Sequence, residues 1–451
     1  MSRPDYLRLE HFGGLYFSRA THSYHALEPF FVRFLLAARE RSAIELCAAD
    51  DSWLPFPPPV LAENIVRWQQ EGFLDDTYRC RARVVSAASA PCTLVAPLKT
   101  SLYVTDACNL RCRHCYVPTA ARPTRSGLGL DVAAALFAEL EALGALQLVI
   151  SGGEPLVRPD LLELLALANG HGLEVTLCTN ATTITPKVAA RLARVRPQLI
   201  SVSVDGATAA THDALRGTGA FAKTVRGIRA LLGAASVDVR IRTTVTTLNV
   251  DDIEALVPFA AALGVRRLAI KPFRALGVAG AARALVLPRP VYEGAAARVL
   301  SRAADFDCQV SVATGMPERF PAWTGVSPAF ACTGGTTRAT VLADGRVVAC
   351  GAVPAADDWT LADHSYFDCW QHAPSITRWR QIPVAADCRA CAVLASCAGG
   401  CRARAVAAFG TLAAADPWGP CPPSLAPTTP PRRRRAPSRT DARRPAGSAR
   451  R

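Results

Sequence analysis

The sequence predicts an α/β protein in which helices cover a parallel sheet. From about Pro97 onward, candidate strands alternate with alanine- and leucine-rich helical stretches. The six candidate strands are SLYVT, LQLVIS, LEVTLCT, QLISVSV, VDVRIRTTVT and RRLAIKP. This alternation predicts parallel pairing, because parallel strands need long crossover connections. In such an architecture, function gathers at the C-terminal ends of the strands.

Residues 1–92 follow a different pattern, which predicts a small winged-helix-like module. YLRLE and GLYFS predict a hairpin around Gly13 and Gly14. LEPFFVRFLLAARE predicts a helix, and VLAENIVRWQQEGFL predicts a second one that ends at Gly72, a residue favoured after helix C-termini. The apolar faces consist of Leu27, Phe30, Phe31, Phe34, Leu35 and Ala38 in the first helix and of Leu61, Ile65 and Trp68 in the second.

The composition favours a large protein with reduced cysteines. The chain has 451 residues, of which 50% are apolar, so two or three folded units are expected. It contains 16 cysteines, yet it begins with no signal-peptide pattern, and secreted disulfide scaffolds are usually far smaller. No uncharged apolar run of about 18 residues predicts a membrane span. We therefore expect a cytoplasmic protein, without membrane partners, whose thiolates bind metal.

A C-terminal tail carries most of the net charge of +14. Residues 422–451 are rich in Pro, Arg, Ser and Ala, and the segment PPRRRRAPSRTDARRPAGSARR contains nine arginines and one aspartate. Little apolar surface is available to offset the entropy of ordering, so we expect the tail to be disordered. Two interpretations of the tail remain open. It is either an incidental extension or a segment that attracts an acidic peptide or a nucleic acid weakly and in a salt-sensitive way. Nucleic acid is not the expected partner.

The loop after the first candidate strand, TDACNLRCRHCYV, contains Cys108, Cys112 and Cys115. A disulfide within so short a loop would be strained and would leave one thiol over. A zinc site uses four ligands, usually in pairs separated by a longer spacer. Three thiolates in one loop suit an iron–sulfur cube, in which they bind three irons and leave the fourth open to another ligand.

The spacing C-x3-C-x2-C, with the aromatic residue His114 just before the last cysteine, resembles the radical S-adenosylmethionine (SAM) enzymes. This resemblance implies a partial (β/α)6 TIM-type barrel over residues 97–325. It also implies that Cys108, Cys112 and Cys115 are the catalytic site. There they would hold a 4Fe-4S cluster whose open iron binds SAM, with His114 beside the cofactor.

A second motif, ISGGEPLVRPD, follows the candidate strand LQLVIS. Its two glycines let the backbone approach a ligand closely, and Glu154 adds an acceptor. Taken alone, the segment is equally compatible with an ordinary strand-to-helix turn. Beside the three cysteines, Gly152, Gly153, Glu154 and Pro155 resemble the family's Gly-Gly-Glu-Pro motif, which implies contact with the amino group of SAM.

Four further residues are candidate cofactor contacts by the same resemblance. SVSVDGATAATHDALRG resembles the family's fourth-strand region, which implies that Ser203 and Arg216 lie near the ribose or carboxylate of SAM. Asn180, at the end of LCTN, and Arg242, in RIRTT, are candidate contacts of the same kind. A turn cap or a surface ion pair is the alternative for each of these residues.

Residues 328–421 contain few large apolar residues and many cysteines, which favours organisation by metal. The spacings C-x12-G-x4-C and C-x2-C-x5-C-x3-C resemble the SPASM extension of radical SAM enzymes and imply two auxiliary iron–sulfur clusters. A zinc ribbon is the alternative, but the cysteines exceed one zinc site and are spaced more tightly than typical ribbon pairs. The resemblance assigns Cys388, Cys391, Cys397 and Cys421 to one cluster and Cys332, Cys350 and Cys401 to the other.

The second of these sets is one ligand short. Family members with a complete site usually have another cysteine between the first two, and residues 333–349 contain none. The remaining iron is either open to a substrate thiolate or bound by Cys308, Cys369 or a non-cysteine group. The cysteines that match no motif, Cys47, Cys80, Cys92 and Cys178, are expected to be buried or incidental thiols.

The N-terminal pattern, which ends in RWQQEGFL, resembles the peptide-recognition element of pathways for ribosomally made peptides (RiPPs). The free-standing form of that element is the pyrroloquinoline-quinone chaperone. Such modules bind a leader peptide as an added strand at a sheet edge. An oligomerisation module or a DNA-binding winged helix is the alternative.

Together the resemblances imply a radical SAM oxidoreductase that matures a precursor peptide by a thioether or carbon–carbon crosslink or another backbone change. The implied partners are the leader of that peptide and a one-electron donor such as flavodoxin or ferredoxin. One alternative is a maturase that oxidises a Cys or Ser of a partner protein, similar to sulfatase-activating enzymes. Those relatives have more cysteines and no leader-binding module. A non-enzymatic iron–sulfur electron carrier is another alternative, but it leaves Gly-Gly-Glu-Pro unexplained.

Overall fold

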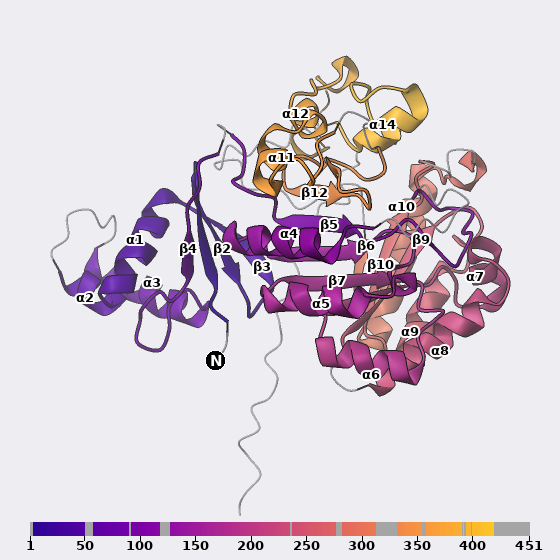
Figure 1. Cartoon of the computed structure of the whole chain (residues 1–451), viewed down its shortest axis with the longest axis horizontal. Helices are drawn as coiled ribbons and strands as arrows, with labels where there is room; N and C mark the ends of the chain where they lie inside the picture. Colours follow the sequence, from indigo (N-terminus) through magenta and orange to yellow (C-terminus); the bar gives the residue numbers. More distant parts are fainter. Residues whose placement is uncertain are drawn as a thin grey trace, which may run out of the picture.

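Two sheets organise the described part of the chain (Figure 1). The computed structural model describes residues 3–418, except 50–56, 90–91, 118–126, 235–236, 277–281, 313–331, 354–357, 390, 392–393 and 398. Cys421 and the tail at 422–451 lie outside the described residues, so the expectations for them stay predictions. Within those limits, no helix combines the length and the apolar character that a membrane crossing requires.

The N-terminal sheet contains the predicted hairpin and two further strands. The hairpin consists of β1 (Tyr6–Glu10) and β2 (Gly13–Ser18), and the φ of 133° at Gly13 favours glycine at the turn. Strand β3 (Ser23–Leu27) pairs antiparallel with β2, and β4 (Arg83–Val85) pairs parallel with β1. The sequence patterns do not predict β3, in which Leu27 alone is buried, or β4, which has only three residues.

Three helices cover the outer face of this sheet. Helices α1 (Pro29–Glu40) and α3 (Pro58–Gln70) are as predicted, whereas the short α2 (Ala43–Ala48) is an addition. Aromatic side chains join the helices, with the ring centroids of Phe31 and Trp68 at 4.4 Å. The other face of the sheet lies against the barrel (Figure 1) and shares its core through Tyr6, Leu15, Phe17 and Val85.

A buried ion pair fixes the N-terminal sheet to the barrel. Nε of Arg8 lies 2.6 Å from Oε1 of Glu10, and both side chains are buried. Arg8 also donates to Ala96 O (2.9 Å) and to Leu143 O (3.4 Å). Glu10 accepts a hydrogen bond from the N–H of Val95 (3.0 Å). The N-terminal sheet is therefore held in one orientation against the barrel.

The second sheet contains the six predicted strands, all parallel and side by side in sequence order. Two parallel strands extend it, one at each end, and β13 adds an antiparallel edge, so among the described residues the barrel stays open. The prediction of a partial barrel is confirmed. The strands are β5 (Lys99–Tyr103), β6 (Gln147–Ser151), β7 (Glu174–Thr179), β8 (Leu199–Ser203), β9 (Val239–Val245), β10 (Arg267–Pro272), β11 (Gln309–Val312), β12 (Arg338–Val341) and β13 (Val347–Val348).

Helices cover the outside of the barrel, and strand alternation separates its two faces. Outward positions such as Leu148, Ile150 and Leu177 are fully buried under the helices. Inward positions such as Cys178, Arg242 and Lys271 are partly accessible although their strands are central, so the barrel interior holds space. The helices are α4 (Leu130–Ala142), α5 (Leu161–Gly170), α6 (Pro186–Val195), α7 (Ala209–Arg216), α8 (Ala220–Gly233), α9 (Leu256–Leu263) and α10 (Arg289–Ala303).

The cysteine-rich region is built partly onto the barrel core. Its strand β12 continues the barrel sheet beside β5, and its helices are α11 (Tyr366–His372), α12 (Pro374–Arg380), α13 (Leu394–Cys397) and α14 (Arg402–Phe409). Trp370 is fully buried and donates from Nε1 to Leu94 O (2.8 Å), and Tyr366 OH lies 2.6 Å from Thr100 Oγ1. The expectation that metal, more than a core, organises this region is therefore wrong for its first half, which has an apolar core.

Candidate active site

The three-cysteine loop runs across the C-terminal end of the barrel sheet, directly after β5. Cys108, Cys112 and Cys115 are free thiols and partly accessible. A backbone turn links the N–H of Cys115 to Cys112 O (3.1 Å), and the N–H of Arg113 donates to Leu215 O (2.9 Å) at the end of α7. Burial raises the pKa of Cys112 to about 11, which a bound metal would offset by stabilising the thiolate.

The two glycines of the Gly-Gly-Glu-Pro motif let β6 contact this loop. The N–H of Gly153 donates to Thr105 O (2.7 Å). A Cβ at Gly152 would lie 2.4 Å from Thr105 O, and one at Gly153 would lie 2.1 Å from Ala107 O, so no larger residue fits. The close approach expected of these glycines therefore includes the backbone of the cysteine loop itself.

Glu154 links the ends of β6 and β7. Its carboxylate accepts hydrogen bonds from Thr179 Oγ1 (2.7 Å), from the N–H of Asn180 (2.7 Å) and from the N–H of Leu156 (3.1 Å). Burial raises its pKa, and these hydrogen bonds oppose the rise. The next residue, Pro155, is buried and begins a short 3-10 turn. Both carboxylate oxygens of Glu154 therefore stabilise the local fold, whether or not they also accept a hydrogen bond from a ligand.

Asn180 connects the end of β7 to the cysteine loop. Its Nδ2 donates to Asn109 Oδ1 (2.8 Å), and its Oδ1 accepts from the N–H of Thr182 (2.9 Å). Asn109 in turn donates to Thr182 Oγ1 (2.9 Å). The amide of Asn180 therefore positions the loop between Cys108 and Cys112.

Asp205, which the sequence analysis missed, is the centre of a buried network below the loop. Its Oδ2 lies 2.6 Å from Nε of Arg216 and 3.2 Å from Nε2 of His114, and its Oδ1 accepts from the N–H of Thr244 (2.8 Å). Burial opposes the charge, but Arg216 and His114 together hold the pKa of Asp205 below its usual value. Arg216 also points Nη1 at the sulfur of Cys112 (3.8 Å). The sequence feature that could have indicated Asp205 is the Asp-Gly pair directly after SVSV.

His114 is a neutral imidazole with one unused acceptor. Burial lowers its pKa to about 4, so at neutral pH it carries a single proton. The contact of Nε2 with the Asp205 carboxylate places that proton on Nε2. Nδ1 is buried and has no partner in the described part of the chain. An unpaired buried acceptor beside the cysteines fits a bound donor group, as the predicted cofactor contact requires.

Ser203 and Arg242 are neighbours on the inner face of the barrel, where β8 pairs with β9. Lys271, at the end of β10, also lies on this inner face and was not predicted. Burial lowers the pKa of Lys271 well below its usual value, and the charges of Arg242 and Arg274 lower it further. Arg242, Lys271 and Arg274 therefore place three basic side chains together next to the cysteine loop.

Cys332, Cys350 and Cys401 come together above the barrel. Cys332 and Cys350 pack with Trp379, and Cys350 and Cys401 pack with Leu276. Burial, and then the charge of Cys332, raise the pKa of Cys350 to about 12. In the described ranges, no group of three His, Cys, Asp or Glu side chains is placed to hold a single metal ion. Packing and charge are therefore the contacts that relate these cysteines to one another.

Two arginines make the position of Cys401 electropositive. Burial disfavours its thiolate, but Arg274 and Arg404 reverse the effect, and the pKa of Cys401 falls below its usual value. Asp416 holds this arrangement: it accepts from Nε of Arg404 (2.8 Å) and from the N–H of Cys401 (2.7 Å). A cysteine whose thiolate is stabilised by fixed cations fits a ligand of an anionic cluster.

The other predicted auxiliary set is described only in part. The N–H of Cys391 donates to Cys388 O (3.1 Å), Cys397 ends α13, and Cys421 lies outside the described residues. Neither alternative ligand lies near the first set: Cys369 is buried in the barrel core, and Cys308 precedes β11, at the N-terminal end of the strands.

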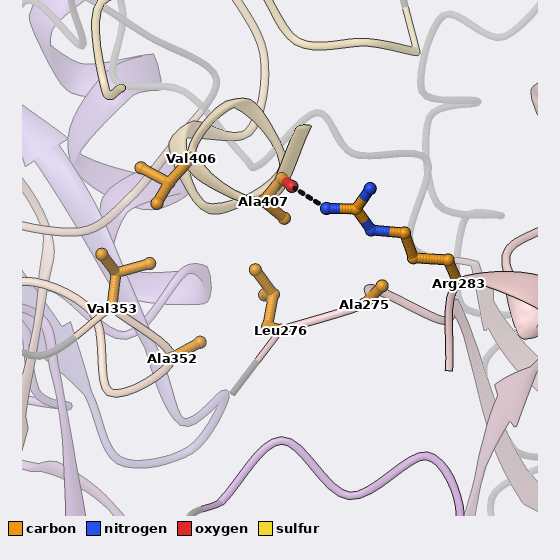
Figure 2. A pocket seen from close by; sticks show the side chains of 7 residues that line it. All are labelled: Ala275, Leu276, Arg283, Ala352, Val353, Val406 and Ala407. Atoms are coloured by element: carbon orange, nitrogen blue, oxygen red, sulfur yellow. Dashed lines mark hydrogen bonds between the residues drawn. The ribbon is translucent and has the colours of Figure 1, made fainter. Parts of the chain in front are cut away.

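A cavity of about 210 Å³ opens between the barrel and the cysteine-rich region (Figure 2). It is mostly apolar, and at its rim Nη2 of Arg283 donates to Ala407 O (3.4 Å). Its wall includes residues just beyond Cys350. The lining residues are Ala275, Leu276, Arg283, Ala352, Val353, Val406 and Ala407.

Comparison with known proteins decides the family. The Radical SAM superfamily model matches residues 102–260, which include the three cysteines and the Gly-Gly-Glu-Pro segment. An AdoMet-dependent heme synthase of Methanosarcina barkeri is 30% identical over 344 residues, which cover 72% of this chain and 96% of the relative. The chain is a member of the radical SAM superfamily. As a radical SAM protein, it binds a 4Fe-4S cluster and SAM.

Other relatives of this radical SAM protein are named as a maturase and as a peptide cyclase. The mycofactocin maturase MftC of Mycobacterium ulcerans is 33% identical over 327 residues, 69% of this chain and 84% of the relative. The PqqA peptide cyclase of Ruegeria pomeroyi is 31% identical over 340 residues, 74% of this chain and 90% of the relative. Streptococcus suis SuiB bound to its precursor peptide SuiA shares the fold, with a TM-score of 0.67 at 17% identity over 92% of this chain and 98% of that one.

Proposed function

We propose that this radical SAM enzyme oxidatively modifies a ribosomally made precursor peptide. The N-terminal sheet carries this proposal. Strand β3 is an edge of that sheet, and no described strand pairs with its outer side. An open edge offers main-chain hydrogen bonds to an added strand, which is how a leader peptide binds to such modules. The names of the mycofactocin maturase and of the PqqA peptide cyclase support the same class of reaction.

The residues around the loop have distinct proposed roles. Cys108, Cys112 and Cys115 hold the cluster, and Gly152 and Gly153 place backbone groups beside it. When cluster and SAM are bound, reductive cleavage of SAM supplies a radical that removes hydrogen from an unactivated carbon. The protein orients the cofactor through its own side chains, with His114, Asn180, Ser203 and Arg216 as the proposed contacts, whereas Arg242 lies beside Lys271 and is proposed to face the substrate.

The cysteine-rich region is proposed to hold two auxiliary clusters. Cys332, Cys350 and Cys401 bind one of them, with an iron left open to a substrate group, and Cys388, Cys391, Cys397 and Cys421 bind the other. Arg274 and Arg404 supply the positive charge that an anionic cluster needs beside Cys401. The apolar cavity next to this set fits an apolar side chain of the peptide (Figure 2). Flavodoxin or ferredoxin in the cytoplasm is the proposed electron donor.

The edge strand provides the test. Successive N–H groups of a strand point to opposite edges, so one of His25 and Ala26 donates toward the open side. We expect that one of the variants His25→Pro and Ala26→Pro keeps its melting temperature but binds the leader of the co-encoded precursor at least about tenfold more weakly, since proline removes a donor. His25→Ala is the matched control. Unchanged leader affinity in both proline variants would contradict leader binding at β3.

A second candidate function is a reaction on a tetrapyrrole. It is favoured by the heme synthase, which this chain matches over 96% of the relative's length. The N-terminal sheet argues for the peptide, because a small planar substrate has no use for an open strand edge. Mass spectrometry of the co-expressed precursor tests the first candidate: a peptide that loses two hydrogens supports maturation, and an unmodified peptide counts against it.

A further inference from the structure

Four cationic side chains lie together between the cysteine loop and the cysteine-rich region: Arg242 on β9, Lys271 on β10, Arg274 just beyond it, and Arg338 on β12. Burial, and then the charges of Arg242 and Arg274, lower the pKa of Lys271, and the charge of Arg242 also acts to lower the pKa of Arg338, whose side chain is exposed. None of the four side chains forms a hydrogen bond or an ion pair with any described residue. Three of the four, Arg242, Lys271 and Arg274, are only partly accessible, and such cations are costly unless a ligand pairs with them.

Cysteine side chains of the protein itself act electrostatically on two of these cations, Arg274 and Arg338. Arg274 lies beside Cys401, Cys350 and Cys332, whose charges raise its pKa, and Cys332 and Cys350 act on Arg338 in the same direction. A cluster bound by those cysteines therefore faces both arginines. Arg242 and Lys271 face no such set of cluster-binding cysteines.

The anionic groups near Lys271 are already engaged or weak. Asp205 and Cys178 are the groups that raise its pKa. Asp205 already pairs with Arg216 at 2.6 Å and accepts from the N–H of Thr244. Cys178 is a thiol on the inner face of β7. An anion from outside the chain is therefore missing at Lys271 and Arg242.

A tyrosine adds a directed donor at this place. Nζ of Lys271 lies 5.7 Å from the ring centroid of Tyr116. Tyr103 OH donates to Tyr116 OH (3.2 Å), so the proton of Tyr116 remains free to donate elsewhere. Tyr116 directly follows Cys115, so this donor lies at the cysteine loop. In the sheet, Lys271 pairs with Thr244, two positions along β9 from Arg242 on the same inner face.

We propose that Lys271, Arg242 and Tyr116 form a carboxylate-binding subsite in the barrel, and that the reacting segment of the substrate carries a carboxylate. The inference rests on the proposed function in that the carboxylate belongs to a peptide, either from an acidic side chain or from the C-terminus. Charge-assisted hydrogen bonds from an amine, a guanidinium and a phenol suit a planar carboxylate. The carboxylate of SAM is the competing anion, but its expected place is the open iron on the Arg216 side of the loop.

Four synthetic decapeptides test the subsite. They share one apolar sequence and differ only in a central Glu or Gln and in a free or amidated C-terminus. We expect a carboxylate-bearing peptide to bind the anaerobically reconstituted full-length enzyme about tenfold more tightly than the neutral amide, with the stronger arm identifying the source. Lys271→Met and Arg242→Met should abolish that preference, and SAM affinity should change less than about twofold in Lys271→Met. Lys187→Met and Arg226→Met, which remove exposed charges on outer helices, are the matched controls.

Each contrary result is distinguishable. Equal binding of the neutral and the acidic peptides would overturn the subsite and leave the peptide function intact. A matching loss of SAM affinity in Lys271→Met would assign these side chains to SAM instead. A porphyrin with propionate groups serves as a fifth ligand. If it binds in a Lys271-dependent way while no peptide binds, the subsite stands and the peptide function fails; if no ligand binds, the subsite fails.

Discussion

Asp205 is the residue on which the geometry of the cysteine loop depends most. It has no exposed surface, and it joins His114 from the loop, Arg216 from α7 and Thr244 from β9. Arg216 also points Nη1 at the sulfur of Cys112, so the network of Asp205 extends to the cysteine loop. Because Asp205 and its charged partner Arg216 are both buried, the carboxylate contributes charge as well as shape.

Asp205→Asn tests this role. The amide keeps the shape but leaves the guanidinium of Arg216 buried without a counter-charge, which costs about 3–5 kcal/mol of the free energy of unfolding. Asp251→Asn, at an exposed carboxylate, is the control and should stay within about 0.5 kcal/mol of the wild type. Urea denaturation of the metal-free protein measures both. Equal stability of the two variants would contradict the network.

His212 makes the free energy of unfolding depend on pH. Burial lowers its pKa to about 4, with Arg216 adding to the effect, and Nδ1 accepts from the N–H of Asp205 (3.3 Å). From pH 6.5 down to about 4 the unfolded chain takes up a proton that the folded protein does not, so stability is complete above this window and falls as the pH falls through it. The expected loss at pH 5 is about 2 kcal/mol.

The matched variant is His212→Asn, which keeps an acceptor for that N–H but does not titrate. Unfolding free energies at pH 7 and pH 5 should differ less in this variant than in the wild type. His114 contributes the same fall to both proteins, because its pKa is also lowered to about 4. An identical drop in the two proteins would mean that His212 is protonated in the folded state.

At the level of elements, the N-terminal sheet acts as a fixed part of the enzyme. Tyr6, Leu15 and Phe17 belong to the barrel core, and Arg8 reaches the barrel backbone. A leader bound to β3 is therefore held at a constant position relative to the barrel. The sequence patterns predict the hairpin and the two long helices of this module, but they do not reveal its attachment, because a buried Arg8–Glu10 pair looks like ordinary surface polarity within a strand.

Arg8→Met tests that attachment. Glu10 would remain buried without its partner, and the free energy of unfolding should fall by about 3–5 kcal/mol. The double variant Arg8→Met/Glu10→Gln should recover at least about 1 kcal/mol, because the amide can still accept from Val95 without a buried charge. Guanidinium denaturation measures the series. No recovery in the double variant would mean that Arg8 acts through its packing and its backbone hydrogen bonds and not through its charge.

At the scale of the whole molecule, the sequence predicts the partial barrel, its six strands and the loop that carries the chemistry. These features have local signatures: period-two strands, helix-forming spacers and a cysteine spacing. It does not predict Asp205, Lys271 or the integration of β12, because each depends on which strands become neighbours. Lys271 in particular stands in RRLAIKP as an ordinary strand residue, and only the barrel places it beside Arg242 and Tyr116.

Reductive cleavage of SAM tests the central claim most directly. The anaerobically reconstituted full-length protein, given SAM and dithionite, should form 5'-deoxyadenosine and methionine, as measured by liquid chromatography. Cys112→Ala should abolish both products, whereas Cys92→Ala, at an exposed cysteine outside every motif, should not reduce them. Cleavage that survives in Cys112→Ala at the wild-type rate would contradict the assignment of the three-cysteine loop.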